Sequence, residues 1–207
     1  MGSMGPNVDF DAPADTVLSP SVLAHVVLRT QKLKEMVDFY TTYVSQARGE
    51  NPVHGGHVVY GNDFLCFITY DDEHHRVALV GVPDTTPKVP NSAGLHHIAF
   101  TFPGLADLLL AYRQRKAKGI LPVWCVNHGP TNSIYYKDPE GNMLETQVDN
   151  FDNPEAATAF MASAEFAANP IGTDFDPEDY ITRLKGGEPE DDLKRRVEIG
   201  QRGPPNI

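Results

Sequence analysis

Two histidines and one glutamate occupy positions where they could hold a divalent metal ion. His25 and His97 lie 72 residues apart, each within a β-type run, and the same offset relates Tyr40 to Tyr112 in two helical stretches. Two imidazoles placed by a repeat, together with the carboxylate of Glu145, are typical of a divalent metal site. Each residue alone is more commonly a satisfied strand side chain, so the prediction depends on the three together.

The elements that must position these residues form a tandem repeat. A strand, a helix and three strands are predicted within residues 21–82, and the same order recurs within residues 94–150 after a proline-rich linker. Near the end of each unit the offset is 67 residues, which places Ala78 opposite Glu145. A set of two histidines and one carboxylate leaves open coordination positions, as in non-haem Fe(II) enzymes that bind substrate and O₂ together.

The repeat predicts an α+β fold in which two βαβββ modules pair into one domain, residues 21–150, with a concave sheet around the metal site. Neither unit is large enough to form a stable core alone. Residues 1–20 are predicted to be a disordered N-terminal arm. Residues 151–207 are predicted to form an acidic C-terminal extension wrapped on the domain, with helices near 154–168 and 177–185.

Charge and composition exclude several classes of protein. The chain has 17 Lys+Arg against 28 Asp+Glu, which argues against binding to nucleic acid or to an anionic membrane. The extension holds 12 acidic and 6 basic residues, more than half of the net charge of −11. No apolar run approaches the roughly 20 residues that span a bilayer. Cys66 and Cys125 lie in apolar stretches and predict free thiols in the reducing cytoplasm.

The tandem pattern resembles the vicinal oxygen chelate superfamily, which includes glyoxalase I, fosfomycin-resistance proteins and type I extradiol ring-cleaving dioxygenases. One stretch resembles the extradiol signature at every constrained position: Val126-Asn127-His128, five residues, Ile134-Tyr135, two residues, Asp138-Pro139-Glu140-Gly141 and finally Glu145. Residues 94–100, which read Gly-Leu-His-His-Ile-Ala-Phe, are similar to the family's second ligand strand, in which the second histidine binds iron. The resemblance covers about residues 22–149.

The resemblance implies an Fe(II)-dependent extradiol dioxygenase that cleaves a catechol ring and places both atoms of O₂ in the product. Fe(II), with Mn(II) as a second option, would be held by His25, His97 and Glu145. Neither NAD nor a flavin is required, in agreement with the absence of a Gly-rich dinucleotide motif. The expected partners are a catechol and O₂, with no nucleic acid and no membrane.

The resemblance also implies roles for other residues of the site. His75 and His128 match the active-site histidines of the family, and Tyr135 matches a tyrosine ten residues before the glutamate ligand. His96 is expected to point away from His97 and to support the site. Considered alone, His75 would be a polar turn residue, His128 a loop residue and Tyr135 a packed strand residue. His54 and His57 receive no role.

The family's familiar members have two such domains, whereas this chain has one. The extension or a partner subunit must then complete the substrate pocket, and a homo-oligomer is expected. Two other functions remain open. A glyoxalase-like isomerase or lyase would want a fourth protein ligand where Ala78 stands. A metal-free binding module of the bleomycin-resistance kind would leave the paired histidines unexplained.

Overall fold

The computed structural model describes residues 17–45, 55–203 and 205. The predicted N-terminal arm lies mostly outside the described residues, as does His54. Residues 17–25 lead into the first strand without helix or strand.

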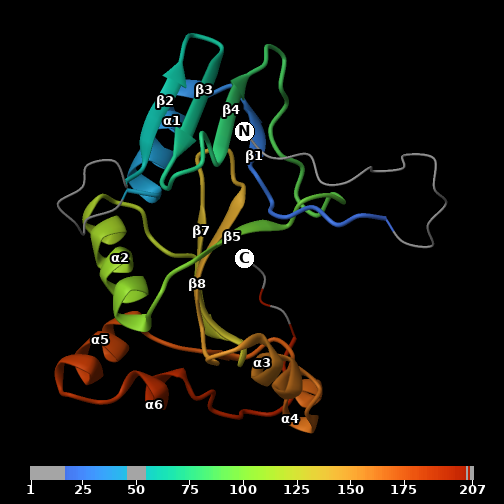
Figure 1. Ribbon diagram of the computed structural model, residues 1–207. Coiled ribbons are helices and arrows are strands. Elements are labelled where there is room, and N and C mark those ends of the chain that lie inside the picture. The colour runs from blue at the N-terminus through green and yellow to red at the C-terminus, as the bar shows by residue number, and fades with distance from the viewer. Residues whose placement is uncertain (1–16, 46–54, 204, 206–207) are drawn as a thin grey trace, which may run out of the picture.

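The first module is a four-stranded sheet with one helix (Figure 1). Its elements are β1 (Val26–Thr30), α1 (Leu33–Tyr43), β2 (His57–Gly61), β3 (Leu65–Thr69) and β4 (Val77–Gly81). The strand order is β1-β4-β3-β2, in which β1 is parallel to β4 and the other pairs are antiparallel. The first strand of the module therefore lies beside its last strand.

The second module repeats this arrangement. Its elements are β5 (His97–Thr101), α2 (Leu105–Ala117), β6 (Trp124–Asn127), β7 (Thr131–Lys137) and β8 (Met143–Asp149). The strand order is β5-β8-β7-β6-β9, where the short strand β9 (Thr173–Asp174) comes from the C-terminal extension. Again the first strand of the module, β5, is parallel to its last, β8.

The registers of the two modules confirm the predicted βαβββ repeat. Val27 lies opposite Ala78 in the first sheet, and Ala99 lies opposite Glu145 in the second. The offsets of 72 and 67 residues therefore relate equivalent positions, and Ala78 stands where the second module has its glutamate. The described strands form two sheets, one for each module, instead of one shared sheet.

The larger of two apolar clusters among the described residues joins the two modules and the extension. It contains Met36 and Leu79 from the first module, Leu108 and Leu144 from the second, and Leu193 from the extension, all at most 1% exposed. Because neither sheet buries its apolar face alone, the modules and the extension stabilise one another.

Neither long helix has an N-cap side chain of its own. The Glu140 carboxylate accepts a hydrogen bond from the backbone N–H of Gln31, two residues before α1 (3.1 Å). Glu190 accepts hydrogen bonds from the N–H groups of Leu105 and Ala106, at the start of α2 (3.1 and 3.0 Å). The start of α2 thus takes its cap from a segment far away in the sequence, and a distant carboxylate likewise binds the chain just before α1.

The extension lies beneath the second module in Figure 1. Its helices are α3 (Pro154–Met161), α4 (Ala164–Ala168), α5 (Pro177–Lys185) and α6 (Glu190–Lys194). The expectation of one helix over 154–168 is wrong, because Ser163 ends that run and caps α4 by accepting a hydrogen bond from the Phe166 N–H. Sequence patterns did not predict β9 or α6.

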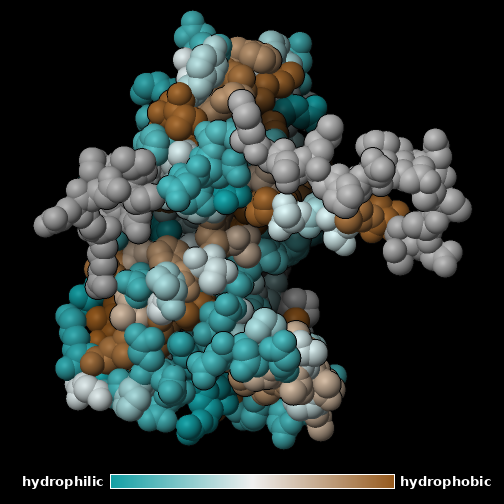
Figure 2. Space-filling model, viewed as in Figure 1, coloured by the Kyte–Doolittle hydropathy of each residue, from teal (hydrophilic) through white to brown (hydrophobic). Residues whose placement is uncertain are grey.

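Charged pairs fix α5 to α2. Glu178 of α5 contacts Arg113 at 2.5 Å and Lys116 at 2.8 Å. Figure 2 shows that the surface over α5 and α6 is mostly hydrophilic. None of the described helices is both long enough and apolar enough to cross a membrane.

Candidate active site

His97 and Glu145 form the centre of the candidate site, on neighbouring parallel strands. The Nε2 atom of His97 lies 2.9 Å from the Oε2 atom of Glu145, whose side chain is 5% exposed. Burial by itself would raise the pKa of Glu145, but hydrogen bonds from His97 and Ser133 lower it below the ordinary value. The same contact with Glu145 raises the pKa of His97. Glu145 is therefore ionised at neutral pH.

The geometry of this pair fits two adjacent ligands of one divalent ion. Nitrogen and oxygen ligands of such ions lie about 2.1 Å from the metal, so neighbouring ligands at a right angle are about 3 Å apart. The separation of 2.9 Å between His97 and Glu145 agrees with this value. Imidazole and carboxylate are also ligands that iron and manganese accept.

His25, the third predicted ligand, lies elsewhere. It is exposed, one residue before β1, and its ring contacts that of His75 (4.4 Å between centroids). The described residues contain no group of three or more His, Cys, Asp or Glu placed to hold a metal ion. The structure thus brings together two of the three predicted ligands, and the part of His25 stays a prediction based on the repeat.

Tyr135 and His128 lie beside the pair in the second module. Tyr135 of β7 is in register with Glu145, and its hydroxyl lies 3.0 Å from Nε2 of His128, in the loop after β6. Burial raises the pKa of Tyr135 and lowers the pKa of His128. Both side chains are therefore neutral near pH 7, the phenol as a hydrogen-bond donor and the imidazole as a possible proton acceptor.

Strand alternation explains why these side chains share one face. His97, Tyr135 and Glu145 belong to one face of the second sheet, whereas their neighbours Tyr136 and Leu144 are in the core on the other face. Tyr136 thus faces away from Tyr135.

His96 does not point away from His97 as expected. The Nδ1 atoms of the two rings lie 2.8 Å apart. His96 precedes the first residue of β5, so the alternation of side chains along a strand does not apply to it. That His96 supports the site stays a prediction, and His97 is the residue that it contacts directly.

His75 lies with His25 in the first module. Its ring stacks on Phe67 and contacts His74, each at 4.4 Å between centroids. Burial, followed by the neighbouring imidazole of His25, lowers the pKa of His75. No hydrogen bond or ring contact between described residues joins this group to that of His97. The acid/base role of His75 stays a prediction.

Trp124 belongs to the site although sequence analysis did not single it out. Its indole stacks on Tyr135 (5.0 Å) and meets His128 edge-on (5.4 Å). Its Nε1 donates a hydrogen bond to Asp174 of the extension (2.7 Å). One signal in the sequence could have found it. Trp124 lies two residues before Val126, which begins the signature stretch, so the two side chains are on the same face of one strand.

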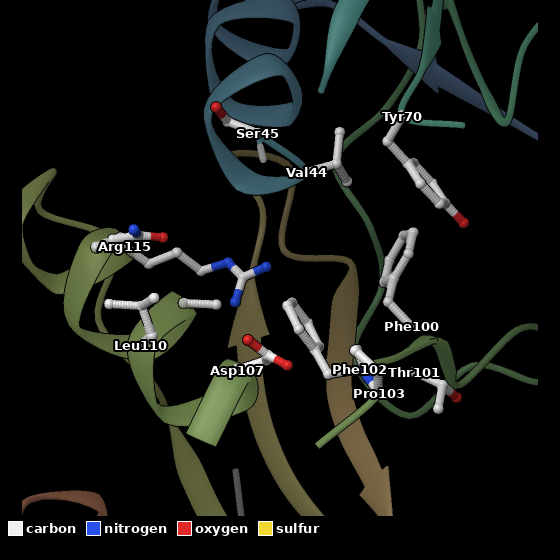
Figure 3. Close-up of a pocket in the computed structure, with 12 residues that line it drawn as sticks. Val44, Ser45, Tyr70, Phe100, Thr101, Phe102, Pro103, Asp107, Leu110 and Arg115 are labelled. Carbon is white, nitrogen blue, oxygen red and sulfur yellow. The ribbon is translucent and has the colours of Figure 1, made fainter. Parts of the chain in front are cut away.

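A pocket of about 430 Å³ lies away from this group, between the end of α1, α2 and β5. Figure 3 shows Arg115 extending from α2 into it, with Phe100 and Phe102 across from it. The guanidinium donates two hydrogen bonds to the Tyr43 carbonyl, at the C-terminal end of α1. None of the predicted site residues lines this pocket, and its buried cation already holds the two helices together.

The fold of two βαβββ modules and the pairing of His97 with Glu145 define a class of protein. The chain belongs to the glyoxalase/bleomycin resistance protein/dioxygenase superfamily, whose family model matches residues 22–146. The resemblance seen in the sequence is thereby confirmed.

Two relatives from Rhodococcus globerulus are similar along most of their length. The chain is 47% identical over 169 residues to biphenyl-2,3-diol 1,2-dioxygenase 2, covering 81% of this chain and 84% of the relative. It is 45% identical over 177 residues to biphenyl-2,3-diol 1,2-dioxygenase 3, covering 84% and 88%. A glyoxylase/bleomycin resistance protein/dioxygenase domain from Frankia sp. EAN1pec superposes with a TM-score of 0.50 at 14% identity, over 65% of this chain and 96% of that domain, which is a likeness of fold alone.

Proposed function

We propose that the protein is an extradiol dioxygenase, which cleaves the aromatic ring of a catechol and places both atoms of O₂ in the product. Two relatives named biphenyl-2,3-diol 1,2-dioxygenase are 45–47% identical in sequence to the chain over 84–88% of their own length. The observation that carries the proposal is the grouping, on one face of one sheet, of the His97–Glu145 pair with the Tyr135–His128 pair.

The proposed metal is Fe(II), with Mn(II) as the second option, held by His97, Glu145 and His25. The spacing of His97 and Glu145 supports the first two ligands, and the repeat equivalence of His25 and His97 supports the third. A divalent ion held there would be chelated by both oxygens of a catechol and would favour loss of their protons.

The chain's own residues would handle the protons. The unprotonated Nε2 of His128 can accept a proton from a catechol hydroxyl group and later return it. The neutral Tyr135 hydroxyl can donate a hydrogen bond without competing strongly as a ligand. Trp124 packs against both rings and shields that side of the site from water.

The test is a turnover measurement on protein purified anaerobically and loaded with Fe(II). With catechol or 2,3-dihydroxybiphenyl we expect a yellow ring-fission product and one O₂ consumed per ring cleaved. The same protein loaded with Zn(II), which has no redox chemistry, is the matched control and is expected to consume no O₂. An iron-loaded protein that consumes no O₂ with any of a panel of catechols would contradict the proposal.

We also propose that the protein works in the cytoplasm as a homo-oligomer. Cys66 and Cys125 are both free thiols, which suits a reducing compartment. The oligomer stays a prediction from the sequence.

A further inference from the structure

We propose that the C-terminal extension is a working part of the active site: the carbonyl of Ile171 determines which ring nitrogen of His128 carries the proton, and Gly172 and Arg196 are positioning residues that hold this contact. The consequence for catalysis rests on the proposed function, whereas the state of the His128 ring can be measured without turnover.

The first step concerns the His128 ring. Its Nδ1 lies 2.6 Å from the backbone carbonyl oxygen of Ile171, and its Nε2 lies 3.0 Å from the Tyr135 hydroxyl. A carbonyl oxygen only accepts hydrogen bonds, so Nδ1 must carry the hydrogen. In a neutral imidazole Nε2 is then unprotonated and can accept the hydrogen of the Tyr135 hydroxyl, for which the Glu145 carboxylate is the second acceptor. The extension thereby presents His128 to the site as a base.

The second step concerns Arg196, which ties the extension to the backbone of His128. A guanidinium has five N–H donors, and all five of Arg196 are used in the structure. They bind the carbonyl oxygens of His128 (3.0 Å), Asn169 (2.7 Å) and Glu165 (3.1 Å), and both carboxylate oxygens of Glu198 (2.8 and 2.9 Å). The Arg196 side chain is 2% exposed. Glu198 balances its charge, so the cation can remain buried.

The third step concerns Gly172, which allows the extension to come close enough. Its φ is +103°, and an added Cβ would lie 2.2 Å from the Asn127 carbonyl oxygen and 2.8 Å from the His128 Cα. Next to it, Thr173 of β9 pairs with Asn127 of β6. The Asn169 side chain accepts from the Gly172 N–H and donates to its carbonyl. Any larger residue at 172 must push the Ile171 carbonyl away from His128.

A purely structural extension would stabilise the second module without governing the His128 ring. The two possibilities are separated by nitrogen NMR of the metal-free protein labelled with ¹⁵N-histidine. A protonated and an unprotonated ring nitrogen have well-separated signals, and those of His128 are identified by their loss in His128→Asn. We expect wild-type His128 to show a protonated Nδ1 and an unprotonated Nε2.

The variant Gly172→Ala is expected to shift His128 towards a mixture of both neutral tautomers. After iron loading, its kcat on catechol should fall about tenfold or more, because the base is no longer fixed in its proton-accepting form. Gly187→Ala is the matched control. Gly187 also lies in the extension with a positive φ, +89°, but its added Cβ meets no atom within 4 Å, so the His128 signals should stay as in wild type.

Two results would overturn the proposal: a wild-type His128 that is protonated at Nε2, or a folded Gly172→Ala that keeps the wild-type tautomer. If Gly172→Ala does not fold, Arg196→Lys takes its place, because an ammonium cannot bind all five acceptors and should release the same contact. If His128 has the expected tautomer but no catechol is cleaved, the proposed function fails and the role of the extension stands.

Discussion

Glu145 shows how one residue is prepared for ligation. Its side chain is buried, yet hydrogen bonds from His97 and Ser133 hold its pKa below the ordinary value, so it stays ionised inside the protein. A buried carboxylate in this state attracts a cation strongly, because no water screens its charge. Such a residue suits a metal site better than an apolar core.

Metal binding tests two of the three predicted ligands one at a time. We expect Glu145→Ala and His25→Ala each to lower Fe(II) affinity by at least about 100-fold, because loss of outer partners of a ligand alone costs 10–100-fold. Affinity would be measured by anaerobic competition with a chelator. The control is His57→Ala, which changes a histidine of β2 outside the proposed site and should leave affinity unchanged. Unchanged affinity in His25→Ala would remove that residue from the ligand set.

Residues with a side-chain signature could be predicted, and those acting through the backbone could not. The resemblance of the stretch from His128 to Glu145 to the family signature implied one site for both residues and Tyr135, and the structure places Tyr135 beside His128 and in register with Glu145. The Ile171 carbonyl has no signature in the sequence, because every residue has a carbonyl group. The position of His25 relative to His97 depends on how the modules meet, which the repeat does not specify.

The two long helices show a dependence between distant elements. The first N–H groups of any helix lack partners within it, and the positive end of the helix dipole favours a carboxylate there. Glu190 supplies this carboxylate for α2, and Glu140 binds the Gln31 N–H just before α1. Hydrophobic spacing predicted where both helices run, but these carboxylates come from other parts of the chain. The helix α6, which carries Glu190, was not predicted, because its contact with α2 joins parts of the chain that are far apart in the sequence.

Stability of the second module should depend on this cap. We expect Glu190→Gln to lower the free energy of unfolding by about 1 kcal/mol, the usual value of an N-cap interaction. Urea denaturation would show a lower midpoint with an unchanged slope. Asp191→Asn removes the same charge from the same helix at an exposed position, and should change the midpoint little. Equal effects of the two substitutions would show that charge, and not the cap, is responsible.

At the scale of the whole molecule, the acidic extension meets a basic helix. Glu178 contacts Arg113 and Lys116 of α2, and hydrogen bonds from Lys116 and Arg113 lower its pKa to about 2. One carboxylate of the acidic extension thus docks directly onto two cations of α2. The net charge of −11 describes the surface and tells little about the site.

This docking predicts a dependence of stability on pH. Because folding lowers the pKa of Glu178 from 4.5 to about 2, its contribution is complete above pH 4.5 and is lost as the pH falls towards 2. Glu178→Gln should therefore lower the Tm at pH 6, and the difference from wild type should shrink as the pH falls from about 5 to about 2.

Glu155→Gln, on the exposed face of α3, is the control for this measurement. Its Tm should follow that of the wild type at every pH. A difference between Glu178→Gln and wild type that stays constant down to pH 2 would rule out the ion pairs as its source.

The arrangement of the strands also sets the order in which the protein can be made. In each module the first strand pairs with the last. Val26 lies opposite Val77 in the first module, and His97 lies opposite Met143 in the second. The hairpins β2–β3 and β6–β7 join sequence neighbours and can form as soon as they leave the ribosome, whereas β1 and β5 must wait as single strands for the end of their module. His97 therefore meets Glu145 only when its sheet closes, so a half-made module cannot capture a metal ion prematurely through this pair.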